Sequence, residues 1–290
     1  MTERKTRPTL KLAAAAETPA ARKAPARAPA QAEAPPSTDD APALTPAEIA
    51  FARALVIYED EDVIAFSKPS GLAAQGGSGV TQSLDGLLAA FAKSNGKRPR
   101  LVHRLDRETS GVMGVGRTQP AAAALSAAFA SRDAIKTYIA VVCGGAPKPA
   151  SAAIDISLKK MARAGVDMVR AARAGDSGVL SARTRYRTLA AVKDAALLSL
   201  QPETGRLHQL RAHLSMIGHP IMGDGKYGGL FSIDGVHAPT MMLHALSLVL
   251  PHPRVGILNV SAPPSEAFAE ACAALGLDLD GPLAAFMGKK

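Results

Sequence analysis

The segment Leu101–Thr118 constrains the fold most strongly, because a charged turn runs directly into an apolar strand. Its sequence is LVHRLDRETSGVMGVGRT, with Asp106 at the centre of the turn. The residues Thr109-Ser110-Gly111 can hold the turn through side-chain-to-backbone hydrogen bonds and supply a flexible joint. The apolar residues of Val112–Val115 predict a buried strand, which would give the Asp106 carboxylate a rigid support.

Asp106 has an arginine on each side of it. Arg104 and Arg107 favour the charged form of the carboxylate, which indicates a nucleophile or an ion-pairing acid rather than a protonated general acid. The alternative is a surface turn with a solvated Arg–Asp pair, because structural ion pairs outnumber catalytic carboxylates. The turn alone therefore leaves both interpretations open.

The nine residues His103–Gly111, HRLDRETSG, resemble the HRLDxxTSG signature of the RluA family of RNA pseudouridine synthases. Other segments resemble this family in the same order along the chain, and together they cover about residues 56 to 260. They are SKPSG at Ser67–Gly71, KTYIA at Lys136–Ala140, GRLHQLRAHLSMIGHPIMGDGKYG at Gly205–Gly228, His244-Ala245 and His252-Pro253.

The resemblance implies an enzyme that isomerises uridine to pseudouridine in structured RNA, either ribosomal RNA, transfer RNA or both. It implies an α+β pseudouridine synthase fold, with a mixed, mainly antiparallel sheet in two halves that flank a basic cleft. Asp106 would be the nucleophile, Tyr138 would stack on the uracil and help to remove the proton from its carbon 5, and Arg206 would form an ion pair with Asp106. The alternative is an RNA-binding or ribosome-assembly protein that has the same fold but no turnover.

Four further residues are expected to contact RNA. Arg104 resembles the family arginine that fills the gap left by a uridine flipped out of the stack. Lys136 shares a strand face with the tyrosine two residues later. A helix predicted to begin at Thr204-Gly205 would carry Gln209 and His213 on the same face as Arg206.

The sequence predicts no metal and no cofactor. His208, His213 and His219 suggest a metal site, but five residues along a helix rotate His208 and His213 about 140° apart, which argues against a zinc-dependent hydrolase. Pseudouridine formation itself needs an ionised carboxylate and no redox centre or nucleotide. Only Cys143 and Cys272 are present, without metal-binding spacing, so we expect no disulfide and a reducing, cytoplasmic location.

The charge of the chain favours a polyanionic partner. The formal net charge is +9, and the first 45 residues hold seven Lys or Arg against five Asp or Glu. The remainder therefore carries 27 basic against 20 acidic residues, or +7, which assigns most of the basic character to the folded part. No apolar run is long enough to span a membrane, and we expect a monomer.

Residues 1–46 are predicted to form a disordered, basic tail rich in Ala and Pro, and residues 47–290 the catalytic domain. The tail holds eight of the 21 prolines and no aromatic residue, so it cannot bury enough apolar surface to fold. It stands where some relatives of the RluA family carry a small S4-type RNA-binding domain, and nothing in it has the periodicity of one.

Hydrophobic periodicity predicts the remaining elements. Helices are expected at 81–94, 119–131, from 204 onward and at 264–275. Strands are expected at 55–58, 62–67, 135–142, 151–158, 181–190, 195–201, 243–250 and 255–260, with a long excursion at 159–178. Arg183, Arg185 and Arg187 would share one strand face, as a basic stripe or as the solvated side of a sheet.

Overall fold

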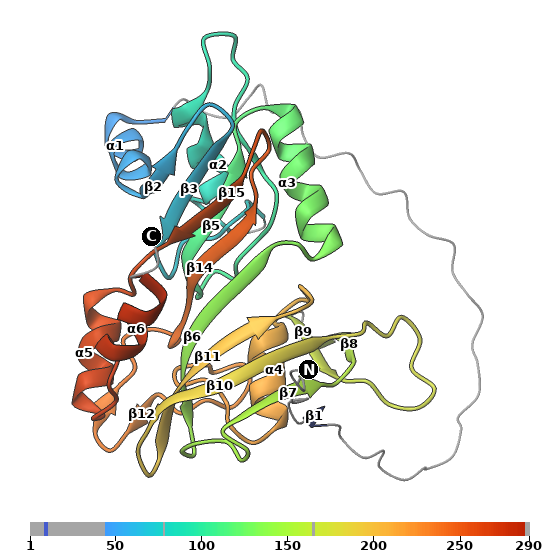
Figure 1. Ribbon diagram of the computed structural model, residues 1–290, viewed down its shortest axis with the longest axis vertical. Coiled ribbons are helices and arrows are strands. Elements are labelled where there is room, and N and C mark those ends of the chain that lie inside the picture. The colour runs from blue at the N-terminus through green and yellow to red at the C-terminus, as the bar shows by residue number, and fades with distance from the viewer. Residues whose placement is uncertain (1–8, 11–43, 78, 164–165, 288–290) are drawn as a thin grey trace, which may run out of the picture.

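The computed structural model describes residues 9–10, 44–77, 79–163 and 166–287 (Figure 1). Most of the predicted tail lies outside the described residues. Its described residues at positions 9–10 form strand β1 (Thr9–Leu10), which pairs in parallel with β7 (Ser151–Asp155). Among the described residues, no helix combines the length and the apolar character needed to cross a membrane.

The predicted α+β class and mainly antiparallel sheet are confirmed. The described residues form an eleven-stranded sheet in the order β1-β7-β10-β11-β6-β14-β5-β3-β2, with β15 paired to β14 and β4 paired to β5. Its further strands are β2 (Val56–Glu59), β3 (Val63–Lys68), β4 (Arg100–Leu101), β5 (Ser110–Gly116), β6 (Ile135–Cys143), β10 (Arg183–Ala191), β11 (Ala195–Pro202), β14 (Leu243–Pro251) and β15 (Ile257–Ser261). A separate small hairpin joins β12 (Ser232–Ile233) to β13 (Val236–His237).

The sheet has two halves, which β6 and β14 join. In Figure 1 the upper half contains β2, β3, β5 and β15, and the lower half contains β7, β10 and β11. At the junction β14 pairs with β5 in parallel over only two positions, His244 with Ser110 and Ala245 with Gly111. Gly111 has φ +112°, and a Cβ there would lie 2.2 Å from the Ala245 carbonyl oxygen, so this approach requires glycine.

Helix α3 (Gln119–Ser131) forms at the predicted position and covers β5. Thr118 caps it by accepting a hydrogen bond from the Ala121 N–H, and a proline stands in its first turn. Leu125 is buried on the side that faces the sheet, as its spacing predicts. The chain after β5 therefore returns across the sheet before it enters β6.

Three other helical regions differ from the predictions. Helix α1 (Pro46–Ala54) is unexpected, and Thr45 and Glu48 close its N-terminus as a capping box. In place of the helix expected at 81–94, there is a short α2 (Leu84–Leu87) followed by one 3₁₀ turn, Leu88–Phe91. At the C-terminal end, the helix expected at 264–275 forms as α5 (Glu266–Ala274), but a second helix that was not expected, α6 (Asp280–Met287), follows it.

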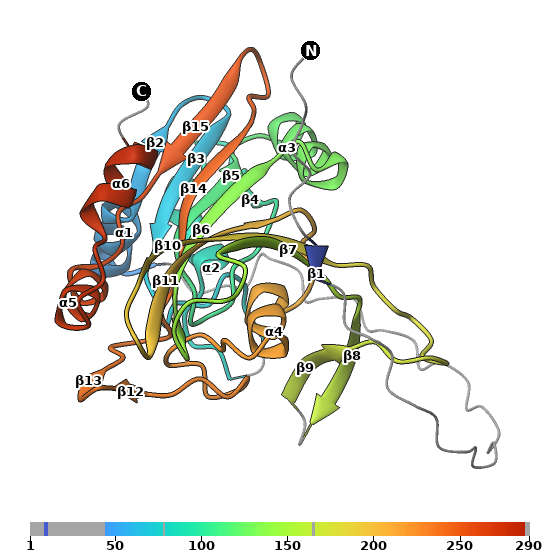
Figure 2. The ribbon, with the colours of Figure 1, turned by 60° about the horizontal axis from the view of Figure 1, so that its bottom comes forward.

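The two remaining elements lie beside the cleft. Helix α4 (Gln209–Met216) begins later than predicted, so residues 204–208 form a turn instead of its first helical turn. The expected excursion contains a hairpin of β8 (Leu158–Arg163) and β9 (Val166–Ala171). Figure 2 shows β8 and β9 beside α4, projecting away from the main sheet.

Candidate active site

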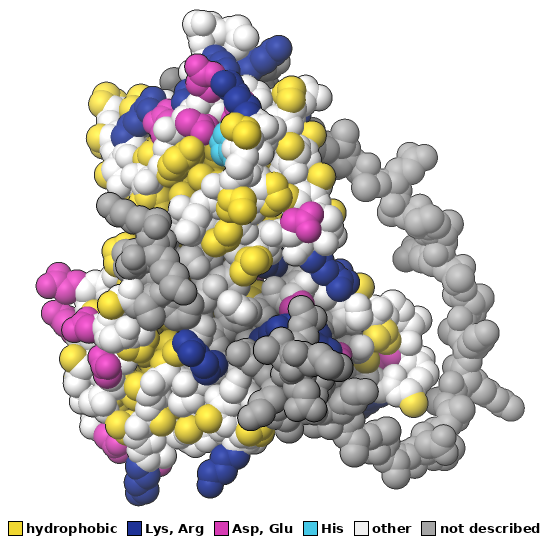
Figure 3. Space-filling view, viewed as in Figure 1, with side chains coloured by type: hydrophobic (Ala, Val, Ile, Leu, Met, Phe, Trp, Pro, Cys, Tyr) yellow, Lys and Arg dark blue, Asp and Glu magenta, His cyan; other side chains and the backbone are white. Residues whose placement is uncertain are grey.

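A cleft of about 1260 Å³ lies between the two halves of the sheet, and Asp106 lines it. Its charged lining is seven Lys or Arg against three Asp or Glu. Arg104 and Lys136 come from one side of the cleft, and Lys160 and Arg185 from the other. Lys and Arg side chains are visible along the hollow between the halves (Figure 3). The basic cleft expected from the sequence is therefore present.

Asp106 stands in the loop between β4 and β5, and its neighbours hold this loop in place. The Thr109 N–H donates to the Asp106 carbonyl oxygen at 3.1 Å, which closes the predicted turn. The Ser70 hydroxyl donates to the Glu108 carbonyl oxygen at 2.8 Å. The SKPSG segment, which begins with the last two residues of β3, therefore supports the Asp106 loop.

Lys68 is the buried centre of this support. Its Nζ donates to the carbonyl oxygens of Pro69, Leu72 and Arg107 at 3.0, 2.8 and 3.2 Å, so all three ammonium hydrogens have acceptors. The residue is fully buried. Burial lowers the pKa of Lys68 to about 8, although the carboxylates of Asp106 and Glu108 oppose the shift.

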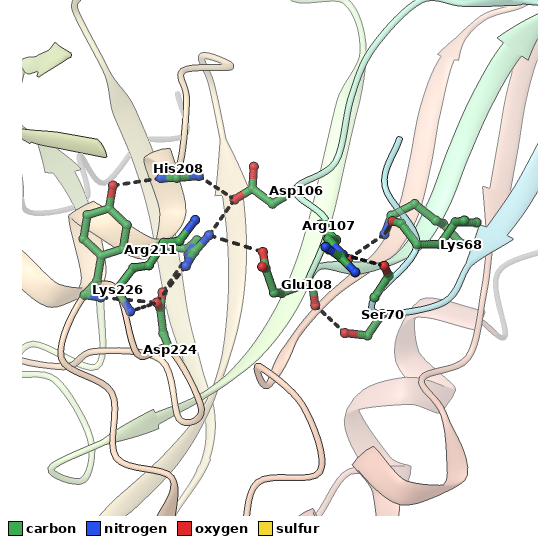
Figure 4. Close-up of polar contacts among 12 residues, drawn as sticks. Lys68, Ser70, Asp106, Arg107, Glu108, His208, Arg211, Asp224 and Lys226 are labelled. Atoms are coloured by element: carbon green, nitrogen blue, oxygen red, sulfur yellow. Dashed lines mark hydrogen bonds and ion pairs between the residues drawn. The ribbon is translucent and has the colours of Figure 1, made fainter. Parts of the chain in front are cut away.

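Arg211 is the cation that pairs with Asp106. Its Nη1 lies 3.2 Å from Asp106 Oδ2 and 3.8 Å from Glu108 Oε2. On its other side, Nε and Nη2 donate to the two oxygens of Asp224 at 2.7 and 2.8 Å. Arg211 is 2% exposed and Asp224 is 1% exposed. This bidentate pair fixes the plane of the guanidinium, which then presents Nη1 to Asp106 (Figure 4).

The ionisation of Arg211 follows from these contacts. Burial alone would lower the pKa of Arg211, but the hydrogen bonds and charge of Asp224, with the charge of Asp106, raise it well above its ordinary value. The guanidinium is therefore a permanent positive charge beside Asp106. Such a charge attracts the Asp106 carboxylate and fixes the position of its Oδ2.

The two oxygens of Asp106 have different surroundings. His208 Nε2 lies 3.8 Å from Oδ2, the same oxygen that Arg211 contacts. Among the described residues, neither a hydrogen bond nor an ion pair reaches Oδ1, and Figure 4 shows this oxygen turned away from both partners. The side chain of Asp106 is 25% exposed. One oxygen is thus held, and the other is open to the cleft.

Tyr138 and Lys136 line the cleft from β6, as their alternation predicts. Tyr138 pairs across the sheet with Leu200 of β11 and Ala245 of β14, so it stands where the two halves meet. Burial raises the pKa of the Tyr138 hydroxyl, and the charge of Asp106 raises it further. The hydroxyl is therefore neutral in the resting site. Burial also lowers the pKa of Lys136.

The predicted ion pair between Arg206 and Asp106 is wrong. Arg206 lies in the turn before α4, and its Nε donates to the Ser181 carbonyl oxygen at 3.1 Å. Because α4 begins at Gln209, Arg211 rather than Arg206 points from the helix toward Asp106. Arg206 still lines the cleft, but at its rim.

Gln209 and His213, which were expected to contact RNA, direct their polar groups into the protein, although Gln209 also lines the cleft. Both residues are buried, and both bind the Thr184 hydroxyl, at 3.0 Å from Gln209 Nε2 and 2.9 Å from His213 Nδ1. The other contacts of Gln209 are with the Thr204 hydroxyl, the Arg206 N–H and the Arg183 carbonyl oxygen. Their hydrogen-bonding groups are thus occupied within the protein. Gln209 fixes the turn before α4, and His213 joins α4 to Thr184 and to the Ile156 carbonyl oxygen.

The two arginines that flank Asp106 in sequence do not pair with it. Arg107 is exposed, and its Nε donates to the Gly71 carbonyl oxygen at 2.9 Å. Arg104 is exposed, lines the cleft and forms no ion pair among the described residues. The interpretation of Arg104 as a surface partner of Asp106 or Glu108 is therefore not supported by the contacts.

Sequence reasoning missed five residues that organise the site: Lys68, His208, Arg211, Asp224 and Tyr227. Lys68 and Asp224 lie in quoted motifs, but nothing in the pattern of these motifs assigns them a role, because Gly223-Asp224-Gly225 indicates only a turn. His208 was considered only as a metal ligand. Among the described residues, no three His, Cys, Asp or Glu side chains are grouped to hold a metal ion.

Comparisons with known proteins agree with this geometry. Residues 62–216 match the RNA pseudouridylate synthase family. A ribosomal large subunit pseudouridine synthase C of Rickettsia bellii is 36% identical over 211 residues, covering 71% of this chain and 68% of that protein. A mitochondrial pseudouridylate synthase of Xenopus tropicalis is 34% identical over 232 residues, covering 71% and 70%. The Escherichia coli K12 synthase C is 31% identical over 226 residues, covering 76% and 69%.

Solved structures give the same result. Human RNA pseudouridylate synthase domain containing 4 aligns with a TM-score of 0.68 and 26% identity, covering 80% of this chain and 98% of that one. Human RNA pseudouridylate synthase domain containing 1 aligns with a TM-score of 0.59 and 25% identity, covering 72% and 82%. The fold, the charged cleft and these matches agree, and the chain belongs to the RNA pseudouridylate synthase family, as an RNA-modifying isomerase of the RluA type.

Proposed function

We propose that this protein isomerises uridine in ribosomal RNA of the large subunit, with Asp106 as the nucleophile. The observation that carries the chemical part is the chain of contacts from Asp224 through Arg211 to Asp106. It fixes the position of the carboxylate, holds one of its oxygens and leaves the other open. Two of the relatives described above are named for the large ribosomal subunit, which supports the choice of RNA.

The reaction accounts for the composition of the site. Carbon 1′ of the ribose moves from N1 to C5 of uracil, and the proton lost at C5 is balanced by the proton gained at N1. No electrons are exchanged, so the chemistry calls for an ionised nucleophile and a protected pocket without a redox partner. Asp106 Oδ1 supplies the nucleophile, and the buried residues around Arg211 form the protected pocket.

Tyr138 is assigned to the uracil ring. Its side chain lines the cleft beside the Asp106 loop, and its flat face suits stacking on a base. Its raised pKa disfavours the phenolate that a general base would need in the resting enzyme, so stacking and positioning come first. Lys136 lies two residues before it on the same face and provides a positive charge to the same bound nucleotide.

RNA would bind along the rim of the cleft. Arg104, Arg185 and Arg206 line it from opposite sides, and a uridine must leave its stack to reach Asp106 at the floor. Arg104 is assigned to the vacated position, since its planar guanidinium can stack where the base was and its side chain has no carboxylate partner among the described residues.

The test is Asp106→Asn, with Asp234→Asn as a matched control that changes an exposed carboxylate away from the cleft. Asp106→Asn should slow single-turnover conversion of a large-subunit RNA fragment by about 10³-fold or more while RNA affinity and melting temperature stay near the parental values. Asp234→Asn should convert RNA at a near-parental rate. Transfer RNA serves as the second substrate, and its preferential conversion would overturn the choice of ribosomal RNA.

An inactive parent protein that still binds RNA tightly would favour the alternative of an RNA-binding or ribosome-assembly protein. Parental turnover by pure Asp106→Asn protein would instead remove Asp106 from its proposed role.

A further inference from the structure

His208 stands where α4, the Asp106 carboxylate and the β8–β9 hairpin meet. It immediately precedes α4 and has φ 47° and ψ 25°, a left-handed conformation that costs most side chains free energy. Its side chain is 9% exposed, and its Nε2 faces Asp106 Oδ2. A strained backbone position next to a reactive group is a reason to ask what the side chain does there.

Tyr227 connects His208 to the hairpin. The Tyr227 hydroxyl oxygen lies 3.0 Å from His208 Nδ1 and accepts a hydrogen bond of 3.0 Å from the Val169 N–H. The two rings meet edge to face, with centroids 5.6 Å apart and planes at 84°. Val169 belongs to β9, so a backbone group of the hairpin lies two hydrogen bonds away from the ring that faces Asp106.

The positions of the hydrogens follow from the acceptors. Tyr227 has one hydroxyl hydrogen, and His208 Nδ1 is the acceptor that faces it. Nε2 then carries the ring hydrogen and presents it to the negatively charged Asp106, whereas a bare Nε2 would repel that carboxylate. Burial lowers the pKa of His208, and the opposing charges of Asp106 and Asp224 do not reverse this shift, so the ring is neutral.

The hairpin is in a position to respond to bound RNA. Lys160 and Asp167, an ion pair at 2.9 Å, line the cleft from it. Its base packs on α4 through Leu158 and Val169, which contact Ala212 in one small apolar cluster. Figure 2 shows the hairpin projecting from the sheet, so its attachment to the protein is narrow.

We propose that His208 is a positioning residue through which Tyr227 and the β8–β9 hairpin set the orientation of the Asp106 carboxylate. This inference rests on the proposed role of Asp106 as nucleophile. Arg211 and His208 both face Oδ2, and together they turn Oδ1 toward the cleft. A shift of the hairpin changes the position of the Tyr227 hydroxyl, and the His208 ring transmits that change to Asp106.

Two substitutions distinguish the roles of the two ring nitrogens of His208. In His208→Asn the shorter amide reaches the Nδ1 position, and Asn tolerates the left-handed conformation, but no N–H faces Asp106. In His208→Gln the longer amide reaches the Nε2 position and restores a donor toward Asp106. Tyr227→Phe removes only the hydroxyl and keeps the ring.

The hairpin end is tested at Val169. Its N–H points to Tyr227 and away from β8, so Val169→Pro removes this donor without removing a hydrogen bond of the hairpin ladder. Val169→Ala is the matched control, because it loses similar apolar packing but keeps the N–H. The difference between these two variants therefore isolates the hydrogen bond to Tyr227.

The measurement is the single-turnover rate at saturating enzyme, with RNA affinity and melting temperature determined separately. We expect His208→Asn, Tyr227→Phe and Val169→Pro each to slow conversion about tenfold with unchanged RNA affinity, the loss expected for one positioning hydrogen bond. His208→Gln should regain much of the loss, and Val169→Ala should stay near the parental rate. The double variant His208→Asn with Val169→Pro should be no slower than the slower single one, since both interrupt one chain of contacts.

Additive losses in the double variant, or parental rates in Tyr227→Phe and Val169→Pro, would overturn the inference. A loss of RNA affinity without a loss of rate would also overturn it, because it would make the hairpin a binding element only. The proposed function fails differently: the parent protein would be inactive, or Asp106→Asn would retain its rate. A parent that is active, an inactive Asp106→Asn and an unaffected His208→Asn would reject the positioning role alone.

Discussion

The floor and the rim of the cleft use their charges in different ways. On the floor, Arg211 and Asp224 are almost completely buried and joined by two hydrogen bonds, and Arg211 reaches Asp106 from there. On the rim, Arg104 is exposed without an ion-pair partner among the described residues, and Arg185 pairs with Glu203 while remaining half exposed. Buried, paired charges fix a geometry, whereas exposed ones adapt to a ligand. The comparison separates the residues that hold the nucleophile from those that meet RNA.

The largest effect is expected on the floor. Arg211→Ala leaves the buried Asp224 without its ion-pair partner and with only the backbone N–H donors of Lys226 and Tyr227. This loss should lower the free energy of unfolding by about 3–5 kcal/mol and abolish turnover. Arg206→Ala, five residues earlier on the rim, should leave stability near the parental value and weaken only RNA binding. Denaturant unfolding of both variants measures the difference. Equal losses of stability would erase the distinction between floor and rim.

The second largest effect is expected on stability as the pH changes, and it comes from His244, which is buried where the two halves of the sheet meet. His244 accepts from the Ser110 hydroxyl at 2.9 Å and donates to the Ala262 carbonyl oxygen at 2.9 Å, and burial lowers its pKa to about 4. The unfolded chain takes up a proton near pH 6.5 while the folded chain stays neutral, so stability falls as the pH drops from 6.5 to 4. The expected loss is about 3 kcal/mol for this group, at 1.36 kcal/mol per pH unit.

The predicted loss is checked by measuring the free energy of unfolding at several pH values between 6.5 and 4 and taking its slope against pH. His244→Gln keeps an amide that can bind the Ala262 carbonyl oxygen, and should flatten the slope in that window. His237, which is exposed, provides the control, since His237→Gln should leave the slope unchanged. An unchanged slope in both variants would show that His244 is not the group that titrates.

A smaller effect is expected at Arg104. If its guanidinium fills the gap left by the flipped uridine, Arg104→Ala should slow conversion of a structured stem-loop about tenfold or more, and of a short flexible strand much less, because less stacking is broken there. Arg104→Lys should rescue poorly, since an ammonium has no planar surface. Single-turnover rates on both RNAs at saturating enzyme decide between stacking and a purely electrostatic role. Equal losses of rate on the two RNAs would show that Arg104 makes only an electrostatic contact.

The smallest effect is expected at Arg187, which shares the exposed face of β10 with Arg183 and Arg185 but does not line the cleft. Arg187→Ala should change the free energy of unfolding by less than about 0.5 kcal/mol and leave the rate unaltered. A change in the salt dependence of RNA binding by Arg187→Ala would instead show that the RNA-binding surface continues along β10 as far as Arg187.

The sequence predicted most of the sheet because alternation and turn chemistry are local signals. The strands that became β2, β3, β5, β6, β11 and β14, and helix α3, lie within a few residues of their predicted positions. The β8–β9 hairpin was missed because its residues are charged and contain Gly and Arg without clear alternation. Helix α1 was missed because its Ala-rich sequence resembles the preceding tail, although Thr45 and Glu48 form a readable capping box.

The motifs predicted the residues that line the cleft, but the resemblance placed the ion pair on the wrong arginine of its motif. Asp106, Tyr138, Lys136 and Arg104 all line the cleft. The resemblance assigned the ion pair with Asp106 to Arg206, whereas Arg211, five residues later in the same motif, forms it. Only the tertiary fold shows that the cation beside Asp106 comes from 105 residues further along the chain, and not from its sequence neighbours.

The cluster around Arg211 also makes the electrostatic potential of the cleft change from its mouth to its floor. One guanidinium is surrounded by the carboxylates of Asp106, Asp224 and Glu108, within 3.2, 2.7 and 3.8 Å, so this group of four side chains carries a net charge of −2. The lining as a whole is positive. We expect the basic mouth to attract a polyanionic strand, and the acidic group at the floor to favour an uncharged nucleobase over a phosphate beside the nucleophile. The same arrangement would turn away free phosphate and nucleotides carrying several charges, which protects the carboxylate from the abundant small anions of a cell.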